Sequence, residues 1–144
     1  MICLTPIAYV EPTNMAAQRS LLVRSVAMAT QTAEIQHIGQ DLIAVCEQNH
    51  EECRVALAGR ITIDSSPDLR MFLLQTLGSL RCLVLAIDFG EVTYVDTSGL
   101  AVLVEVLKVA RQSAKRLQLW RLQEGPRYLL EATRLIHLFE EVNS

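Results

Sequence analysis

Residues Leu80 to Leu100, LRCLVLAIDFGEVTYVDTSGL, give the strongest indication of the fold class. Its first part, residues 80–88, is almost entirely apolar and has strand length, which is typical of a strand buried on both faces and parallel to a neighbour. From residue 98 to about 112, polar side chains recur three or four positions apart, as they do in an amphipathic helix. Residues 89–97 are predicted to form the loop between them.

The residues before this stretch predict a hairpin and a helix. Two β-prone runs, 42–46 and 53–58, flank a polar segment and indicate antiparallel strands. Residues 64–66 supply a cap, and Pro67 follows near the first helical position, so a helix is expected from about 67 to 77. Gly78 then ends that helix.

The residues that follow position 112 predict a strand and two helices. Residues 117–122 alternate as a strand with one buried face does, and Gly125 and Pro126 open a helix that ends near Thr133. The apolar residues between 135 and 139 indicate a short terminal helix. The order strand, strand, helix, strand, helix, strand, helix predicts an α/β fold, with a mixed four- to five-stranded sheet and helices packed on it.

The chain length fits one domain with an extension. Of 144 residues, 41–144 are expected to form the domain. Residues 1–40 contain two of the four prolines and lack a period-2 pattern, so they are expected to be an extension that is partly helical or disordered. Within it, Asn14 could cap a helix that runs to about Ala33.

Composition and charge argue against several classes of function. The net charge is −3, the pI is about 5.6 and no Lys/Arg-rich block occurs, so nucleic-acid binding is not expected. Neither a signal peptide nor a membrane-spanning helix fits the N-terminal residues, where Arg24 interrupts the apolar run. The sequence therefore predicts a cytoplasmic protein without membrane insertion.

Cysteine and histidine spacing gives no sign of a metal site. The four cysteines have no C-x-x-C spacing, and the three histidines complete no zinc pattern, so no metal or cofactor is expected. Cys46 and Cys53 would face one another across a two-residue hairpin loop, so a disulfide is conceivable. Reduced thiols are the expectation, because the cytosol keeps thiols reduced.

The sequence carries no catalytic motif that we can identify. No serine has the glycine spacing of a nucleophile elbow, and no glycine precedes a lysine and a hydroxyl as in a P-loop. Local chemistry alone explains Asp96, Thr97 and Ser98 by helix capping, with one of the three as an N-cap that contributes about 1 kcal/mol. No catalytic residue is therefore assigned.

The same residues carry a family resemblance. Asp88 followed by residues 92–100, VTYVDTSGL, resembles the D-S-S-G-L signature of the STAS domain family, the module of anti-sigma factor antagonists that also occurs on sulfate transporters and in stress-signalling assemblies. The likeness covers about residues 41–140. It implies an STAS-like fold in which Ser98 is the phosphoacceptor of an anti-sigma factor kinase, with Asp96 and Thr97 beside it.

Other parts of the chain match the family less closely. Residues 57–59 resemble the glycine exit from its second strand, and residues 129–139 resemble its C-terminal helix. Thr62 stands where the family has an acidic residue, which weakens the case for nucleotide binding or kinase contact there. Asp64 is close enough in sequence to substitute, so both residues are candidates for contact with a partner or a nucleotide.

The resemblance implies a phosphorylation-switched binding module. It is expected to bind an anti-sigma factor serine kinase while Ser98 is unphosphorylated, to be reset by an opposing phosphatase, and not to be an enzyme. A homodimer is left open. The expected neighbours of the phosphosite in the partner interface are Asp96, Thr97, Gly99 and Leu100. The alternative is a constitutive docking subunit of a transporter or signalling scaffold.

Overall fold

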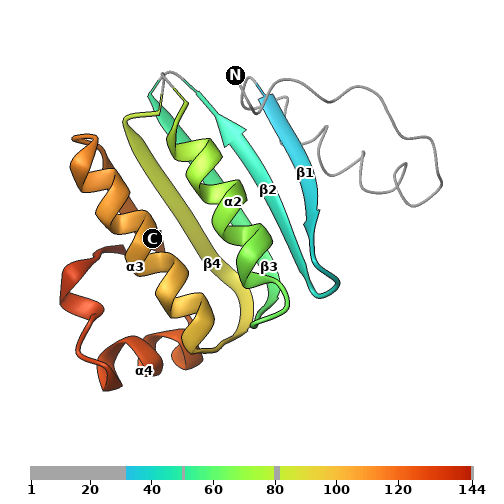
Figure 1. Cartoon of the computed structure of the whole chain (residues 1–144), viewed down its shortest axis with the longest axis vertical. Helices are drawn as coiled ribbons and strands as arrows, with labels where there is room; N and C mark the ends of the chain where they lie inside the picture. The colour runs from blue at the N-terminus through green and yellow to red at the C-terminus, as the bar shows by residue number, and fades with distance from the viewer. Residues whose placement is uncertain (1–31, 50, 80–81, 144) are drawn as a thin grey trace.

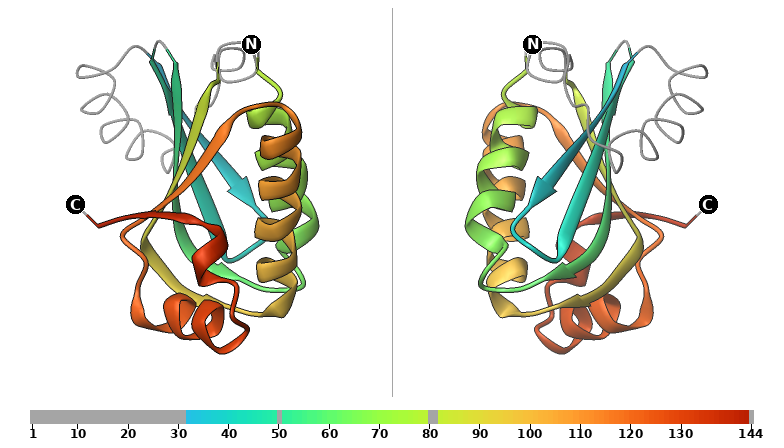
Figure 2. Two further views of the ribbon diagram at one scale, coloured as in Figure 1. Left: turned by 90° about the vertical axis from the view of Figure 1, so that its left-hand side faces the viewer. Right: turned by 90° about the vertical axis from the view of Figure 1, so that its right-hand side faces the viewer.

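The computed structural model describes residues 32–49, 51–79 and 82–143. These residues form a six-stranded sheet, with α2 and α3 side by side on one face (Figures 1 and 2). The strands are β1 (Thr32–Ile38), β2 (Leu42–Gln48), β3 (Glu52–Ile61), β4 (Val84–Val95), β5 (Arg116–Trp120) and β6 (Glu140–Val142). The helices are α2 (Ser66–Leu77), α3 (Thr97–Gln112) and α4 (Glu124–Ala132), with a 3₁₀ turn, η2 (Ile136–Leu138).

The strands lie in the sheet in the order in which they occur along the chain. β1, β2 and β3 pair antiparallel, whereas β3, β4, β5 and β6 pair parallel. A helix connects each parallel pair, because parallel neighbours need a crossover. The mixed α/β class and the first hairpin are therefore confirmed, while the sheet in the described residues has six strands rather than the expected four or five.

The two unexpected strands lie at the edges of the sheet. β1 falls within residues 1–40, which were expected to lie outside the core, yet Ile38 is buried and pairs with Leu42. β1 and the three-residue β6 each pair on one side only, and neither has an apolar run that would distinguish it. The rest of the predicted extension, residues 1–31, lies outside the described residues.

β4 is longer than the sequence suggested. Residues 89–95 were expected to be loop, but they continue the strand, with Phe89 and Val92 buried. The pairing of β4 with β3 shifts register twice along this part, so the alternation of polar and apolar residues is broken where the strand continues. This extension brings Val95 to the end of the sheet, directly before α3.

The core lies between the helices and the sheet. Alternate residues of the central strands point to the helices, as the burial of Val55, Leu57, Leu85 and Ile87 shows. The helical side of the core is made by Leu69, Leu73 and Leu77 of α2 and by Leu103, Val106 and Ala110 of α3. Burial of these aliphatic side chains, at roughly 25 cal/mol per Å² of apolar surface, holds the two helices on the sheet.

The opposite face of the sheet carries an ion pair and a contact between an arginine and an aromatic ring. The Arg121 guanidinium donates two hydrogen bonds of 2.9 Å to Asp88, a largely buried carboxylate on β4. The Arg54 guanidinium lies 4.2 Å from the centroid of the Trp120 ring. Asp88, which begins the family signature, therefore has a structural partner on the adjacent chain segment after β5.

The cysteines do not form the disulfide that a tight hairpin would allow. Cys53 pairs with Gln48 in the β2–β3 register, and its thiol is free, so the conceivable Cys46–Cys53 bond is absent. The expectation of reduced thiols is confirmed for Cys53 and wrong for Cys46, which is disulfide-bonded. Cys53 lies opposite Gln48 rather than Cys46, because four residues, and not two, separate Gln48 from Cys53.

In the described part of the chain, no helix has the length and apolar content needed to span a membrane.

Candidate functional site

Asp96 caps the start of α3. Its backbone is extended, with φ −102° and ψ −174°, and its Oδ1 accepts hydrogen bonds from the N–H groups of Ser98 at 2.9 Å and Gly99 at 3.1 Å. A helix start leaves such N–H groups without intrahelical partners. The sequence allowed Asp96, Thr97 or Ser98 to be the cap, and the structure assigns that role to Asp96.

The Ser98 hydroxyl lies between a carboxylate and a second hydroxyl. Ser98 Oγ is 2.5 Å from Asp96 Oδ1 and 2.9 Å from Ser66 Oγ. Ser98 is half-buried, whereas Ser66, the first residue of α2, is buried. The site is therefore formed where the starts of α2 and α3 meet, at the end of the molecule where β4 leads into α3 (Figure 1).

The segment after β3 is joined to the same carboxylate. The Ile63 N–H donates to Asp96 Oδ2 at 3.0 Å, and the Asp96 N–H donates to the Ile61 carbonyl at 3.1 Å. Thr62 is half-buried beside this contact, and Asp64 is exposed. The structure thus places both residues next to the start of α3, which contains Ser98.

These hydrogen bonds determine the ionisation of Asp96. Burial raises the pKa of its carboxyl, but hydrogen bonds from the Ser98 hydroxyl and from the N–H groups of Gly99, Ser98 and Ile63 outweigh burial and hold the pKa below its usual range. Asp96 is therefore ionised at neutral pH. It places a fixed negative charge 2.5 Å from Ser98 Oγ.

The other residues named with the phosphosite differ in exposure. Thr97 is exposed in the first turn of α3, whereas Gly99 and Leu100 are buried. A Cβ atom on Gly99 would lie 2.5 Å from Ile61 Cγ2, so the glycine allows α3 to approach β3 closely. Gly99 thus positions the helix start, while Thr97 is open to a partner.

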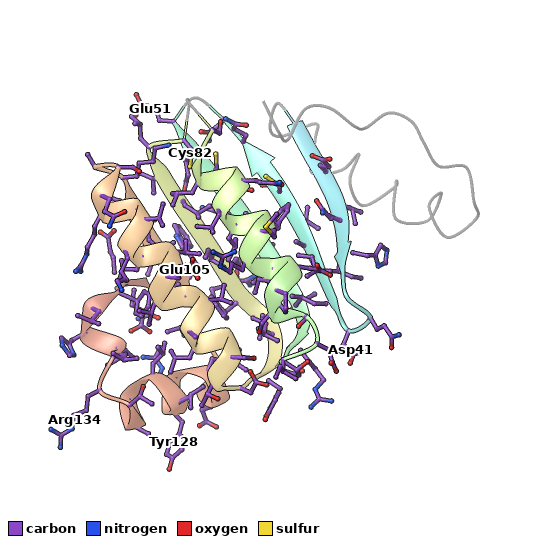
Figure 3. The ribbon with its side chains drawn as sticks, viewed as in Figure 1. Asp41, Glu51, Cys82, Glu105, Tyr128 and Arg134 are labelled. Carbon is purple, nitrogen blue, oxygen red and sulfur yellow. The ribbon has the colours of Figure 1, made fainter. Side chains whose placement is uncertain are left out.

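A shallow groove runs along α3 from this site. Its volume is about 570 Å³. It is lined by Thr97, Leu100, Ala101, Val104, Glu105, Lys108 and Leu135. Figure 3 shows Glu105 between α3 and α2, where the Arg70 guanidinium donates to both of its carboxylate oxygens, at 2.7 and 2.6 Å. Thr97 therefore lies both beside Ser98 and in the groove.

Large side chains are exposed near the same end. Ile63 is 70% exposed, although its N–H is bound to Asp96. Tyr94, two positions before Asp96, is 45% exposed, and the Arg60 guanidinium lies 4.9 Å from its ring centroid. Exposed apolar and aromatic side chains that lie near polar ones are found in protein-binding surfaces, where an apolar centre has a polar rim.

Ser66 was not predicted to be a site residue. It was expected in the cap before α2, and it is the first residue of that helix. No local pattern relates it to Ser98, 32 positions later. The contact depends on the packing of α2 against α3. Only the unusual run of Ser65, Ser66 and Pro67 at the helix start could have drawn attention to it.

Metal-binding groups do not gather in the described ranges. Residues 32–49, 51–79 and 82–143 contain no group of three or more His, Cys, Asp or Glu side chains that could hold a metal ion. The chemistry available around Ser98 consists of hydroxyls, one ionised carboxylate and backbone N–H groups.

Comparison with known proteins gives a family and a fold. The family model described as Mlab, STAS domain matches residues 45–140. No curated protein matches the sequence. Among solved structures, the chain is similar to an anti-sigma factor antagonist from Mycobacterium paratuberculosis, with a TM-score of 0.63, 17% identity, and coverage of 70% of this chain and 85% of that chain.

Two further structures of similar fold differ in phosphorylation. The unphosphorylated form of the anti-sigma factor antagonist SpoIIAA matches with a TM-score of 0.58, 12% identity and coverage of 76% of this chain and 87% of that one. The phosphorylated form of the Bacillus cell fate determinant SpoIIAA matches with a TM-score of 0.54, 12% identity and coverage of 76% and 90%. At these identities the likeness concerns the fold.

Proposed function

Because the chain belongs to the STAS domain family, we propose that it is an anti-sigma factor antagonist that binds an anti-sigma factor serine kinase while Ser98 is unphosphorylated. The observation that carries the proposal is the position of Ser98, half-buried in the first turn of α3 beside the exposed Thr97. The protein is then a substrate and a binding partner, not an enzyme. It acts in the cytoplasm, where an opposing phosphatase resets it.

Phosphorylation of Ser98 would change the charge of this surface. A phosphate adds roughly −1.5 to −2 charges at pH 7, and here it would join the ionised Asp96. In a tight interface the like charges repel and both must lose water, which disfavours the complex. The partner is therefore released.

The fold itself need not change in this switch. Ser98 lies at the N-terminal end of α3, where the helix dipole favours negative charge. Gly99 and Leu100, which pack α3 on the sheet, are buried behind it. We therefore propose a local electrostatic switch without rearrangement of the domain.

The first experiment identifies the phosphoacceptor. The purified protein is incubated with ATP and with each anti-sigma-type serine kinase encoded in the same genome, and the product is mapped by mass spectrometry. We expect label on Ser98, loss of label in Ser98→Ala and retention of label in Thr97→Ala. Label on a residue outside this pair, or none with a kinase that binds the protein, contradicts the proposal.

The second experiment tests the switch. Binding of the same kinase is compared by size-exclusion chromatography for the wild type, Ser98→Asp and Ser98→Asn. The asparagine variant is the matched control, because it has nearly the same shape as aspartate without the charge. We expect the complex to be lost in Ser98→Asp and kept in Ser98→Asn.

A constitutive docking subunit is the second candidate, and the groove along α3 favours it. Leu100, Ala101, Val104 and Leu135 give this groove an apolar floor that does not depend on the state of Ser98. A transporter or scaffold partner seated there would bind wild type and Ser98→Asp equally. Loss of binding in Val104→Glu together with equal binding of Ser98→Asp would therefore support docking over switching.

A further inference from the structure

We propose that Ser66 is a positioning residue for phosphorylation of Ser98, a statement that rests on the proposed function of that serine. The Ser66 hydroxyl, 2.9 Å from Ser98 Oγ, donates a hydrogen bond to this oxygen before phosphate transfer and to a phosphoryl oxygen after it. Ser66 is buried, 5% exposed, so it is not itself an acceptor that a kinase could reach.

The direction of the hydrogen bond follows from the number of protons. Each serine hydroxyl has one proton to donate. Asp96 is ionised and can only accept, so the Ser98 proton lies in the 2.5 Å contact with Asp96 Oδ1. Ser98 therefore has no proton left for the contact between the two serines, so only Ser66 can donate in it.

The alternative acceptor for Ser66 is already satisfied. Ser66 Oγ also donates a hydrogen bond of 2.8 Å to the Thr62 carbonyl. That carbonyl accepts from the N–H groups of Ser65 at 3.0 Å and of Ser66 at 2.8 Å, so both of its lone pairs have donors. The Ser66 hydroxyl can therefore turn to Ser98 without leaving a buried acceptor unpaired.

The packing of the two helices holds the serines at this distance. Pro67 fixes the backbone directly after Ser66, and Leu69 of α2 is fully buried in the core. The bidentate ion pair between Arg70 and Glu105 joins α2 to α3 one turn further along. Ser66 therefore presents its hydroxyl from a rigid element, as a positioning group requires.

The transfer step needs such a donor. Ser98 Oγ forms a bond to the γ-phosphorus of a nucleoside triphosphate held by the kinase, the bond from that phosphorus to the β-phosphate oxygen breaks, and the nucleoside diphosphate leaves. The Ser98 proton goes to a base of the kinase, because the N–H groups of Gly99, Ser98 and Ile63 still keep Asp96 ionised. As Oγ loses the proton, the Ser66 hydroxyl stabilises the negative charge that develops on it.

The decisive measurement is made on the phosphorylated protein. Phosphoserine is introduced at position 98 by genetic code expansion, so that no kinase is needed, and the phosphate is titrated by ³¹P NMR. A donor to the phosphate favours its dianion, so Ser66→Ala should raise the phosphate pKa by about 0.5 to 1 pH unit. Thr93→Ala, which removes an exposed hydroxyl bound to the Gly59 carbonyl, should leave that pKa unchanged.

Kinase assays separate this inference from the proposed function. With the kinase that labels Ser98, Ser66→Ala should lower kcat about tenfold, the effect of one lost hydrogen bond, without a change in KM. Ser66→Thr keeps the hydroxyl and should restore both kcat and the phosphate pKa. An unchanged phosphate pKa in folded Ser66→Ala overturns the role of Ser66, whereas failure of every kinase to label wild-type Ser98 overturns the proposed function alone.

Discussion

Asp96 and Ile63 are joined by a 3.0 Å hydrogen bond from the Ile63 N–H to the Asp96 carboxylate, although they lie 33 positions apart in the chain. The other oxygen of that carboxylate caps α3. One side chain therefore holds both the helix start that contains Ser98 and the segment that contains Thr62 and Asp64. Substitutions at Asp96 should affect the whole site.

Asp96→Ala should lower the free energy of unfolding by about 2 kcal/mol, because it removes an N-cap and the bond to Ile63 together. Asp96→Asn keeps an oxygen that can cap the helix and should cost less. Urea unfolding measures both variants. Asp64→Ala is the control, because it removes one negative charge at an exposed residue near the same site. An equal drop in the free energy of unfolding in Asp64→Ala would contradict the specific role of Asp96.

Stability should depend on pH through Asp96. Its pKa is lowered in the folded state, so ionisation stabilises the fold above the unfolded-state pKa of about 3.9, and this stability is lost as the pH falls through the lower folded-state pKa. Urea unfolding between pH 7 and pH 3 should show a stability difference between wild type and Asp96→Asn that is constant above about pH 5 and shrinks below pH 4. A constant difference throughout the range would be the contrary result.

Gly99→Ala should destabilise the protein by about 1 to 3 kcal/mol, although alanine is the better helix former. The added Cβ would lie 2.5 Å from Ile61 Cγ2 and 3.0 Å from Val95 Cγ1, and Ile61 is fully buried. Thermal unfolding tests this prediction. The matched control is Gly125→Ala in the first turn of α4, where the nearest atom is 4.0 Å away and the change should be neutral or slightly stabilising.

Gly59→Ala should be more severe, with a loss of about 3 kcal/mol or more. Gly59 has a φ of +122°, and a Cβ there would lie 2.0 Å from the Asp41 carbonyl oxygen. This carbonyl accepts a hydrogen bond from the Arg60 N–H at 2.9 Å, so it cannot move away without a further loss. Circular dichroism and urea unfolding would show the effect; stability equal to that of Gly125→Ala would refute it.

Local sequence patterns account for most of the fold. The cap at residues 64–67, the apolar run before Asp88 and the alternation from Leu117 onward each reflect one element packed on one core, so α2, the start of β4 and β5 were all correctly expected. The edge strands β1 and β6 were not expected from the sequence. They form by pairing with a neighbouring strand and carry no apolar pattern of their own.

The site was predictable only in part. Residues 96 to 99 stand together in the chain, so their place at a helix start follows from local rules. The contacts of Ser98 with Ser66 and of Asp96 with Ile63 join residues more than 30 positions apart. The first arises from the packing of α2 against α3, and the second from the parallel pairing that sets Ile61 of β3 beside Val95 of β4. Local sequence patterns do not predict contacts between residues so far apart in the chain, so these two contacts could be found only in the structure.

The strand order bears on how the protein folds as it is synthesised. In the described sheet each strand pairs with the one that precedes it in the chain, from β1 to β6. A growing chain can therefore add every strand to a sheet edge that already exists, and no early strand waits for a distant partner. The parallel pairs from β3 to β6 each need a crossover longer than a hairpin, which slows their formation, but the Ser98 site uses only residues up to α3 and can form before β5 and β6 are made.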